Sequence, residues 1–249
     1  MASSNPTQVA DGVYTLGWPM FNWFVVEDGG RLTVVDCGMP KFWDQVEPGL
    51  AKLGRSTADV EAILLTHGDG DHVGFAEKLR TASGAPVLIH PADRELATTT
   101  AHKKTERPIT PYLRHLATWR LLPQFARGGA MKAPPVAEVD PLEPGQVLDV
   151  PGKPRVVHTP GHTPGHCVFH FEGSDAVIAG DALCTLNVLT GRTGMQLLPR
   201  GLTVDSQEAM RSLDAIEATG ASTVLVGHGE PWTGGAAQAA AAARAAGLS

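Results

Sequence analysis

Cysteine is scarce in this sequence. Only three of the 249 residues are cysteines, Cys37, Cys167 and Cys184, and no two of them form a C-x-x-C pair. This excludes a zinc framework built from thiolates and is typical of a reducing cytoplasm, where we expect the protein to reside. We expect all three to be small buried apolar residues.

Positive charge and long apolar runs are also lacking. The chain has 20 Lys and Arg against 26 Asp and Glu, a formal net charge of -6. No basic stripe is available to neutralise phosphates, so we expect no nucleic-acid partner. The N-terminus lacks the basic and apolar regions of a signal peptide, and no apolar run approaches membrane-spanning length. We therefore expect no membrane partner and a small molecule as substrate.

The remaining composition, 43% hydrophobic and 18% charged, is ordinary for a globular protein, and the length suits one α/β domain over residues 1–249. Short apolar runs alternate with amphipathic segments. The predicted strands are 12–17, 21–28, 31–38, 60–66, 85–90, 146–150, 154–159, 167–172, 175–180 and 222–227. The predicted helices are 41–53, 72–82, 206–219 and 236–247, with Phe75, Leu79 and Ala82 buried on one face of the second.

Residues 97–135 break this alternation. Their pattern predicts one or two short amphipathic helices with an apolar face formed by Tyr112, Leu113, Leu116, Trp119 and Leu122. We interpret the segment as a helical insertion that either forms a lid over a site or packs on the main core.

Metal-ligating side chains gather where predicted strands end. The loop T-H-G-D-G-D-H at residues 66–72 follows one strand, and His162, Asp181 and His228 follow three others. Candidate ligands at strand ends and in loops indicate a site at the rim of a sheet. Asp69 is unusual because it stands where a third histidine would complete a more familiar cluster.

Five motifs carry a family resemblance. They are D-C-G at 36–38, T-H-G-D-G-D-H-V-G at 66–74, T-P-G-H-T-P-G-H at 159–166, A-G-D at 179–181 and G-H-G at 227–229. In order and spacing the chain resembles the metallo-β-lactamase-fold hydrolase superfamily, as a glyoxalase II-like or lactonase-like single-domain member. The resemblance implies a four-layer αβ/βα sandwich, in which two mixed β-sheets face each other between helices. It also implies six metal ligands: His67, Asp71, His72, His162, Asp181 and His228.

Asp69 falls on a histidine ligand of the family's H-x-H-x-D-H motif. Two ions would then be held by similar sets, His67, Asp69 and His162 for the first and Asp71, His72 and His228 for the second, with Asp181 shared. Asp69 either binds the first ion directly, or contacts it through a bridging water, or the first site is vacant. We expect two divalent ions, zinc foremost, with iron or manganese favoured by the extra carboxylate. The less positive cluster should acidify water less and move the rate optimum to higher pH.

The resemblance implies a metal-dependent hydrolase in which a metal-bound hydroxide attacks a carbonyl carbon, with Asp71 and Asp181 as catalytic residues. Esters, lactones, thioesters and β-lactams fit this chemistry. An ester or lactone with a hydrophobic portion is preferred, because Trp18, Met20, Phe21, Trp23, Tyr112, Trp119 and Phe125 are available to line a pocket. Two alternatives remain: a mononuclear-iron persulfide dioxygenase, and a non-catalytic small-molecule binding or resistance protein. His166 is a candidate partner of a metal ligand, and the other histidines are interpreted as structural.

Overall fold

The computed structural model describes residues 3–18, 20–99 and 101–249, and two β-sheets dominate it. The larger sheet has the order β1-β2-β3-β4-β5-β6-β7, and the smaller has the order β13-β10-β9-β8. A two-stranded ribbon pairs β11 (Cys184–Leu186) with β12 (Thr193–Gln196). The larger sheet comprises β1 (Ser3–Ala10), β2 (Val13–Trp18), β3 (Phe21–Asp28), β4 (Arg31–Val35), β5 (Val60–Leu64), β6 (Val87–Ile89) and β7 (Asp140–Pro141). The smaller comprises β8 (Arg155–His158), β9 (Cys167–Phe171), β10 (Ala176–Gly180) and β13 (Thr223–Val226).

Both sheets are mixed. Strands β1 to β4 run antiparallel to one another, which confirms the predicted meander, whereas β4 to β7 are parallel. In the smaller sheet β9 is antiparallel to both neighbours and β10 is parallel to β13. The helices are α1 (Val46–Lys52), α2 (Ala76–Ser83), α3 (Arg94–Thr98), α4 (Leu116–Gly128), α5 (Ser206–Glu217) and α6 (Ala236–Ala246).

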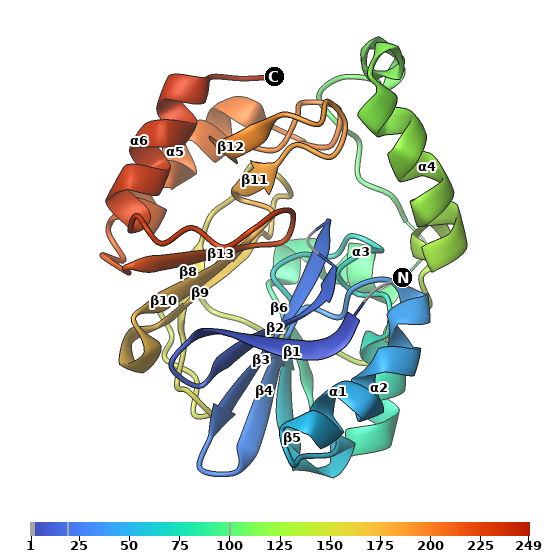
Figure 1. Cartoon of the computed structure of the whole chain (residues 1–249), viewed down its shortest axis with the longest axis vertical. Helices are drawn as coiled ribbons and strands as arrows, with labels where there is room; N and C mark the ends of the chain where they lie inside the picture. Colours follow the sequence, from blue (N-terminus) through green and yellow to red (C-terminus); the bar gives the residue numbers. More distant parts are fainter. Residues whose placement is uncertain (1–2, 19, 100) are drawn as a thin grey trace.

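Alternating side chains assign each strand to two apolar layers. In β3, Phe24 belongs to the core between the sheets, whereas Trp23 belongs to the core beneath α1 and α2. In β10, Ile178 faces the space between the sheets and Val177 packs with α5 and α6. Because successive residues of a strand point to opposite faces, both sheets are apolar on both sides and need helices outside. Figure 1 shows α5 and α6 on one side and α1 and α2 on the other, which confirms the predicted four-layer αβ/βα sandwich.

Local departures from the predicted elements have local causes. Helix α2 begins at Ala76 rather than His72 because the preceding residues bond elsewhere: the Gly74 amide donates to Gly38 and the Phe75 amide to Cys37. Ala82 is exposed, so the predicted buried face was wrong there. Residues 41–53 form a 3₁₀ turn (Pro40–Gln45) before α1, and residues 146–150 form only an isolated bridge. Strands β1, β7, β11 and β12 were not predicted.

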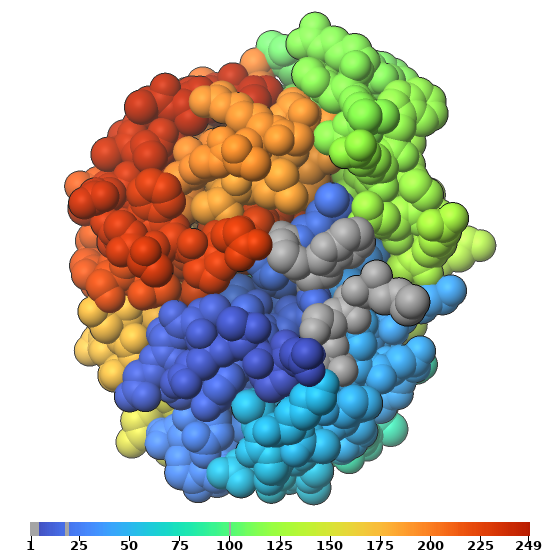
Figure 2. Space-filling model, viewed as in Figure 1, coloured from blue at the N-terminus to red at the C-terminus, as the bar shows by residue number. Residues whose placement is uncertain are grey.

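Within 97–135, apart from Thr100, the structure has a 3₁₀ turn (Thr110–Arg114), α4 and a second 3₁₀ turn (Ala130–Lys132). The predicted apolar face was wrong for α4, although Tyr112 of that face is buried in the core. Leu116 and Trp119 are 64% and 57% exposed, and α4 instead buries Thr118, Leu121 and Gly128. The Thr118 hydroxyl lies 2.8 Å from the Leu189 carbonyl, which ties α4 to the segment beside the β11–β12 ribbon (Figures 1 and 2).

Two further expectations concern burial and membranes. Cys37, Cys167 and Cys184 are all buried and free, as predicted. Among the described residues, no helix combines the length and apolarity needed to cross a membrane.

Candidate metal centre

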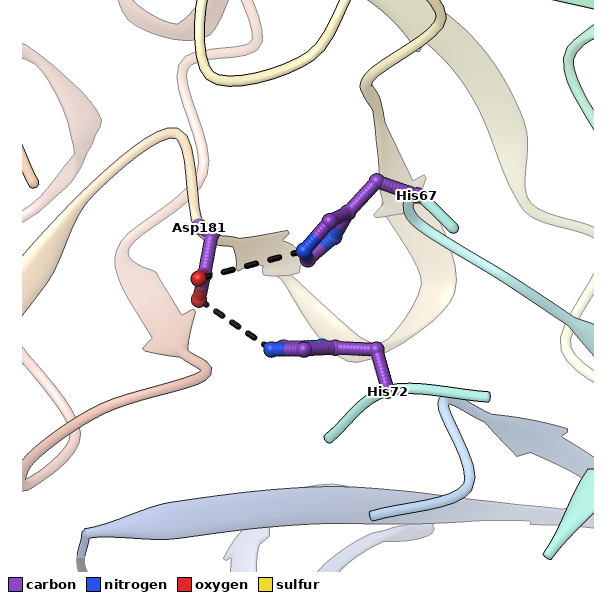
Figure 3. Close-up of side chains that lie close together, drawn as sticks. All are labelled: His67, His72 and Asp181. Atoms are coloured by element: carbon purple, nitrogen blue, oxygen red, sulfur yellow. Dashed lines mark ion pairs between the residues drawn. The ribbon is translucent and has the colours of Figure 1, made fainter. Parts of the chain in front are cut away.

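Four strand ends bring the predicted ligands to one edge of the sandwich. The loop after β5 carries His67, Asp69, Asp71 and His72, and Asp181 follows β10 directly. His162 lies four residues beyond β8, and His228 two residues beyond β13. The carboxylate of Asp181 faces the imidazoles of His67 and His72, which both point toward it (Figure 3).

The second group of predicted ligands converges on a common point. The His228 Nε2 atom lies 3.7 Å from an Asp71 carboxylate oxygen and 3.2 Å from Asp181 Oδ2. The His72 Nε2 atom lies 3.4 Å from Asp181 Oδ1 and 4.0 Å from the Asp71 carboxylate. Four donors around a tetrahedral zinc ion are separated by roughly 3.3 Å, given bonds of about 2.0–2.1 Å. Asp71, His72, His228 and Asp181 are therefore spaced to hold one ion.

The first group of predicted ligands, His67, Asp69 and His162, also has its donor atoms close together. The His162 Nε2 atom lies 3.1 Å from Asp69 Oδ2 and 3.4 Å from Asp181 Oδ2, and His67 Nε2 lies 3.5 Å from Asp69 Oδ2. Asp69 therefore reaches the first group. However, the ammonium of Lys103 also contacts the Asp69 carboxylate and lies 2.6 Å from His162 Nε2.

Hydrogen bonds fix the tautomers of three histidines. The Nδ1 atom of His72 lies 2.9 Å from the Asp36 carboxylate, and that of His228 lies against the Met20 carbonyl. Both partners only accept, so both rings carry the proton on Nδ1 and present the Nε2 lone pair to the centre.

The same reasoning applies to His67 through Thr66. The Thr66 hydroxyl donates to Asp36 Oδ2 at 2.8 Å, so it accepts from His67 Nδ1 at 2.9 Å. His67 thus also presents an Nε2 lone pair. Asp36 is buried at φ 60°, a left-handed conformation that Asp tolerates better than most residues, and it orients two ligands at once.

His166 has a supporting position rather than a ligating one. Its Nε2 atom accepts from the Asp181 amide at 3.1 Å, and its Nδ1 donates to the Thr159 hydroxyl at 2.9 Å. Burial, followed by the neighbouring His67 and His162, lowers the pKa of His166 well below its usual value. The ring is therefore neutral, and both of its nitrogens are engaged in holding the backbone beside the bridging carboxylate.

Interactions between the buried carboxylates and histidines outweigh the effect of burial on the pKa values of Asp181 and His72. Burial alone would raise the pKa of Asp181, but His228 and His72 outweigh it and hold the pKa well below the usual range. Burial would lower the pKa of His72, but Asp181 and Asp36 raise it well above its ordinary value. Both shifts stem from negative charge concentrated beside basic nitrogens, an arrangement that a divalent cation would neutralise.

Buried polar atoms without hydrogen-bonding partners indicate whether these residues fit a metal ion. His67 Nε2, His72 Nε2 and Asp181 Oδ1 are buried and have no hydrogen-bonding partner among the described residues. Buried polar groups are nearly always paired, so these three require an explanation. A cation bound between them supplies the missing partner, and the fit is good.

Close packing leaves no alternative to glycine at position 227. A Cβ atom there would lie 2.4 Å from Asp181 Oδ1 and 2.8 Å from His72 Cε1. The G-H-G motif therefore delivers His228 while letting the backbone pass directly beside the other ligands.

A cleft of about 340 Å³ opens onto these ligands. Asp69, Asp71, His162, Asp181 and His228 form its polar wall. Apolar side chains also line the cleft, including Phe125, Met131, Val188 and Leu202. The 97–135 insertion thus borders the centre, but through Phe125, Ala130, Met131, His102 and Lys103 rather than through the predicted face.

Of the residues named in advance for an apolar pocket, only Phe125 lines this cleft. Phe21 and Trp23 are buried in the core, and Trp119 is on the surface. The Trp18 side chain lies outside the described part of the chain.

Two important residues escaped sequence reasoning. Asp36 stands in the D-C-G motif that carried the family resemblance, so a signal was present, but nothing local showed its hydrogen bonds to Thr66 and His72. Lys103 gave no signal, since it lies in an irregular segment beside another lysine and far along the chain from its partners.

Comparisons with known proteins agree with this geometry. Residues 16–228 match the metallo-beta-lactamase superfamily. The probable metallo-hydrolase YflN of Bacillus subtilis is 28% identical over 238 residues, which cover 91% of this chain and 87% of YflN. The uncharacterized protein Rv2581c of Mycobacterium tuberculosis is 30% identical, with 77% of this chain and 82% of that protein covered.

Solved structures give the same result. The metallo-beta-lactamase family protein TTHA1429 of Thermus thermophilus has a TM-score of 0.66 at 27% identity, with 94% of this chain and 78% of that chain covered. The Rm3 metallo-beta-lactamase has a TM-score of 0.71 at 20% identity, with 98% and 92% covered, and this likeness concerns the fold alone. The chain belongs to the metallo-β-lactamase superfamily, a fold that implies binding of divalent metal.

Proposed function

We propose that the protein is a metal-dependent hydrolase of small esters, lactones or thioesters that carry an apolar portion. The observation that carries the proposal is the convergence of Asp71, His72, His228 and Asp181 beside a cleft that is also lined by apolar side chains. A divalent ion held by these donors supplies Lewis acidity, which makes water nucleophilic near neutral pH and polarises a carbonyl oxygen.

Residues of the chain position the metal ligands and transfer the proton. His72 and His228 hold their Nε2 atoms toward the centre because Asp36 and the Met20 carbonyl fix their tautomers. The backbone amide of Asp181 donates a hydrogen bond to His166 Nε2, which positions this residue. Asp71 lines the cleft, so its carboxylate is placed to take a proton from water and return it to the leaving group.

The apolar lining of the cleft supports the substrate class. Phe125, Met131, Val188 and Leu202 line the same cleft as the ligands. Burial of an acyl chain there contributes roughly 0.8 kcal/mol per CH₂ group. A carbonyl compound with an acyl or alkyl chain would therefore place its reactive carbon beside the ligands and its chain against these apolar side chains.

The dioxygenase alternative depends on His67, His162 and Asp181, where the ammonium of Lys103 already lies against His162. The second group is free of such a cation among the described residues. This contrast favours chemistry at the second group, and thus hydrolysis.

The test compares metal-stripped and metal-reloaded protein on p-nitrophenyl esters, lactones and thioesters of increasing chain length. We expect hydrolysis that returns with added metal and kcat/KM that rises with chain length. Asp71→Asn should abolish turnover while retaining the fold. Saturable binding without product would indicate a binding protein, and oxygen consumption with a thiol persulfide would indicate a dioxygenase; either result would overturn the proposal.

A further inference from the structure

The first group of ligands already contains a cation of this chain. The Lys103 ammonium contacts the Asp69 carboxylate and lies 2.6 Å from the Nε2 atom of His162. Its side chain is only 10% exposed. The ammonium therefore lies against two of the three first-group ligands, Asp69 and His162, while His67 Nε2 has no partner among the described residues.

The hydrogen bonding at His162 shows that this contact uses the atom a metal would need. An ammonium only donates, so His162 Nε2 accepts in this contact, although the same atom also lies 3.1 Å from Asp69 Oδ2, which only accepts. The other nitrogen of the ring is Nδ1. That Nδ1 atom is buried and unpartnered within the described chain, unlike the Nδ1 atoms of His67, His72 and His228. No hydrogen bond thus directs the His162 ring toward a metal.

Described residues on either side of Lys103 are hydrogen-bonded to other parts of the fold. Before it, the Ala97 carbonyl accepts from the Val136 amide. After it, the Glu106 amide donates to Thr203, and the Glu106 carboxylate pairs with Arg200 and accepts from the Ser206 amide at 3.1 Å. The segment that carries Lys103 is therefore attached to the rest of the fold at Ala97 and at Glu106.

The positive charge of Lys103 balances the negative charge of the unusual Asp69. Three carboxylates, Asp69, Asp71 and Asp181, face the centre. One divalent ion and one ammonium neutralise them, whereas two divalent ions beside the same ammonium would leave an excess of positive charge. A histidine at position 69 would offer the ammonium no counter-ion, so the aspartate and the lysine account for each other.

We propose that Lys103 takes the place of the first metal ion, so that the protein holds one divalent ion, at Asp71, His72, His228 and Asp181. This inference rests on the proposed function and narrows it to a centre of one metal ion and one ammonium. It replaces the two-ion cluster expected from the sequence.

The test measures metal stoichiometry, which does not depend on activity. Metal-stripped protein is titrated with Zn²⁺ by calorimetry, and with Co²⁺ by visible absorption. We expect one equivalent in the unaltered protein and two in Lys103→Met, which keeps the length of the side chain but removes its charge. Lys104→Met, at the exposed neighbouring lysine, should retain one equivalent.

Each outcome decides one question. Two tight equivalents in the unaltered protein would overturn the role of Lys103 while leaving the proposed hydrolase intact. One equivalent in both the unaltered protein and Lys103→Met would also overturn it, because the first group would then reject metal for another reason. No binding in any variant would overturn the proposed function itself.

Discussion

Asp36 offers a sharp test of how the second group is organised. Its carboxylate accepts three hydrogen bonds: from the Thr66 amide at 2.9 Å, the Thr66 hydroxyl at 2.8 Å and His72 Nδ1 at 2.9 Å. Asp36→Asn keeps the shape but replaces one oxygen with an NH₂ group. When the remaining oxygen serves the Thr66 amide, the NH₂ faces His72 and forces its proton onto Nε2, the atom that should bind metal.

The expected cost follows from the role of such partners. Removing a carboxylate that orients a ligating histidine typically lowers metal affinity 10- to 100-fold, or about 1.4–2.7 kcal/mol. We expect Asp36→Asn to weaken metal binding at the second group, which contains His72, by this factor. The affinity is measured by competition with a chromophoric chelator. The reduced charge beside His72 acts in the same direction.

The control for general destabilisation is Thr33→Val. Thr33 lies in the adjoining strand β4, is equally buried, and donates to the Pro151 carbonyl at 2.9 Å without contacting the centre. It should lower thermal stability and leave metal affinity unchanged. An Asp36→Asn protein that binds metal as tightly as the unaltered protein would refute the assignment of the His72 tautomer.

Three further predictions concern the cleft, the first group and the insertion. Phe125→Ala should raise KM for long-chain substrates severalfold in steady-state assays, whereas Trp119→Ala, on the exposed face of α4, should not; equal effects would remove Phe125 from the substrate wall. Asp69→His removes the carboxylate that holds the ammonium and supplies an imidazole, so elemental analysis should find a second ion per chain; one ion would contradict the account. Arg200 and the Ser206 hydrogen bonds lower the pKa of Glu106 to about 2 from 4.5, so the protein should lose stability as pH falls through this window. Glu106→Gln should flatten that loss in acid unfolding monitored by circular dichroism, and an unchanged acid profile would show that the attachment at Glu106 contributes nothing.

The sequence predicted the fold well because its signals were local and periodic. Apolar runs at β3, β10 and β13 carry the alternation that assigns residues to two cores, and the motifs at their ends predicted one shared edge. The sequence did not predict which face of helix α4 in the insertion packs against the core. The pattern at Leu116, Trp119 and Leu122 indicates a helical face, but not whether the core lies beneath that face or beneath Leu121.

The site was predicted where a motif spans few residues and missed where contacts are long-range. His67, Asp69, Asp71 and His72 share one loop, so their proximity follows from the spacing. The contact of Lys103 with His162 joins residues 59 positions apart through an irregular segment, and no periodicity encodes it. The expectation of two ions stays a prediction; it was made without the Lys103 ammonium, which the structure places against Asp69 and His162.

The most direct measurement is anomalous diffraction from crystals of the metal-loaded protein, recorded on both sides of the metal's absorption edge. We predict one anomalous peak per chain, about 2.0–2.3 Å from donor atoms of Asp71, His72, His228 and Asp181, with the Lys103 ammonium still against Asp69 and His162. Two peaks, with Lys103 displaced, would contradict the single-ion centre. A peak remote from His228 would contradict the metal centre as a whole.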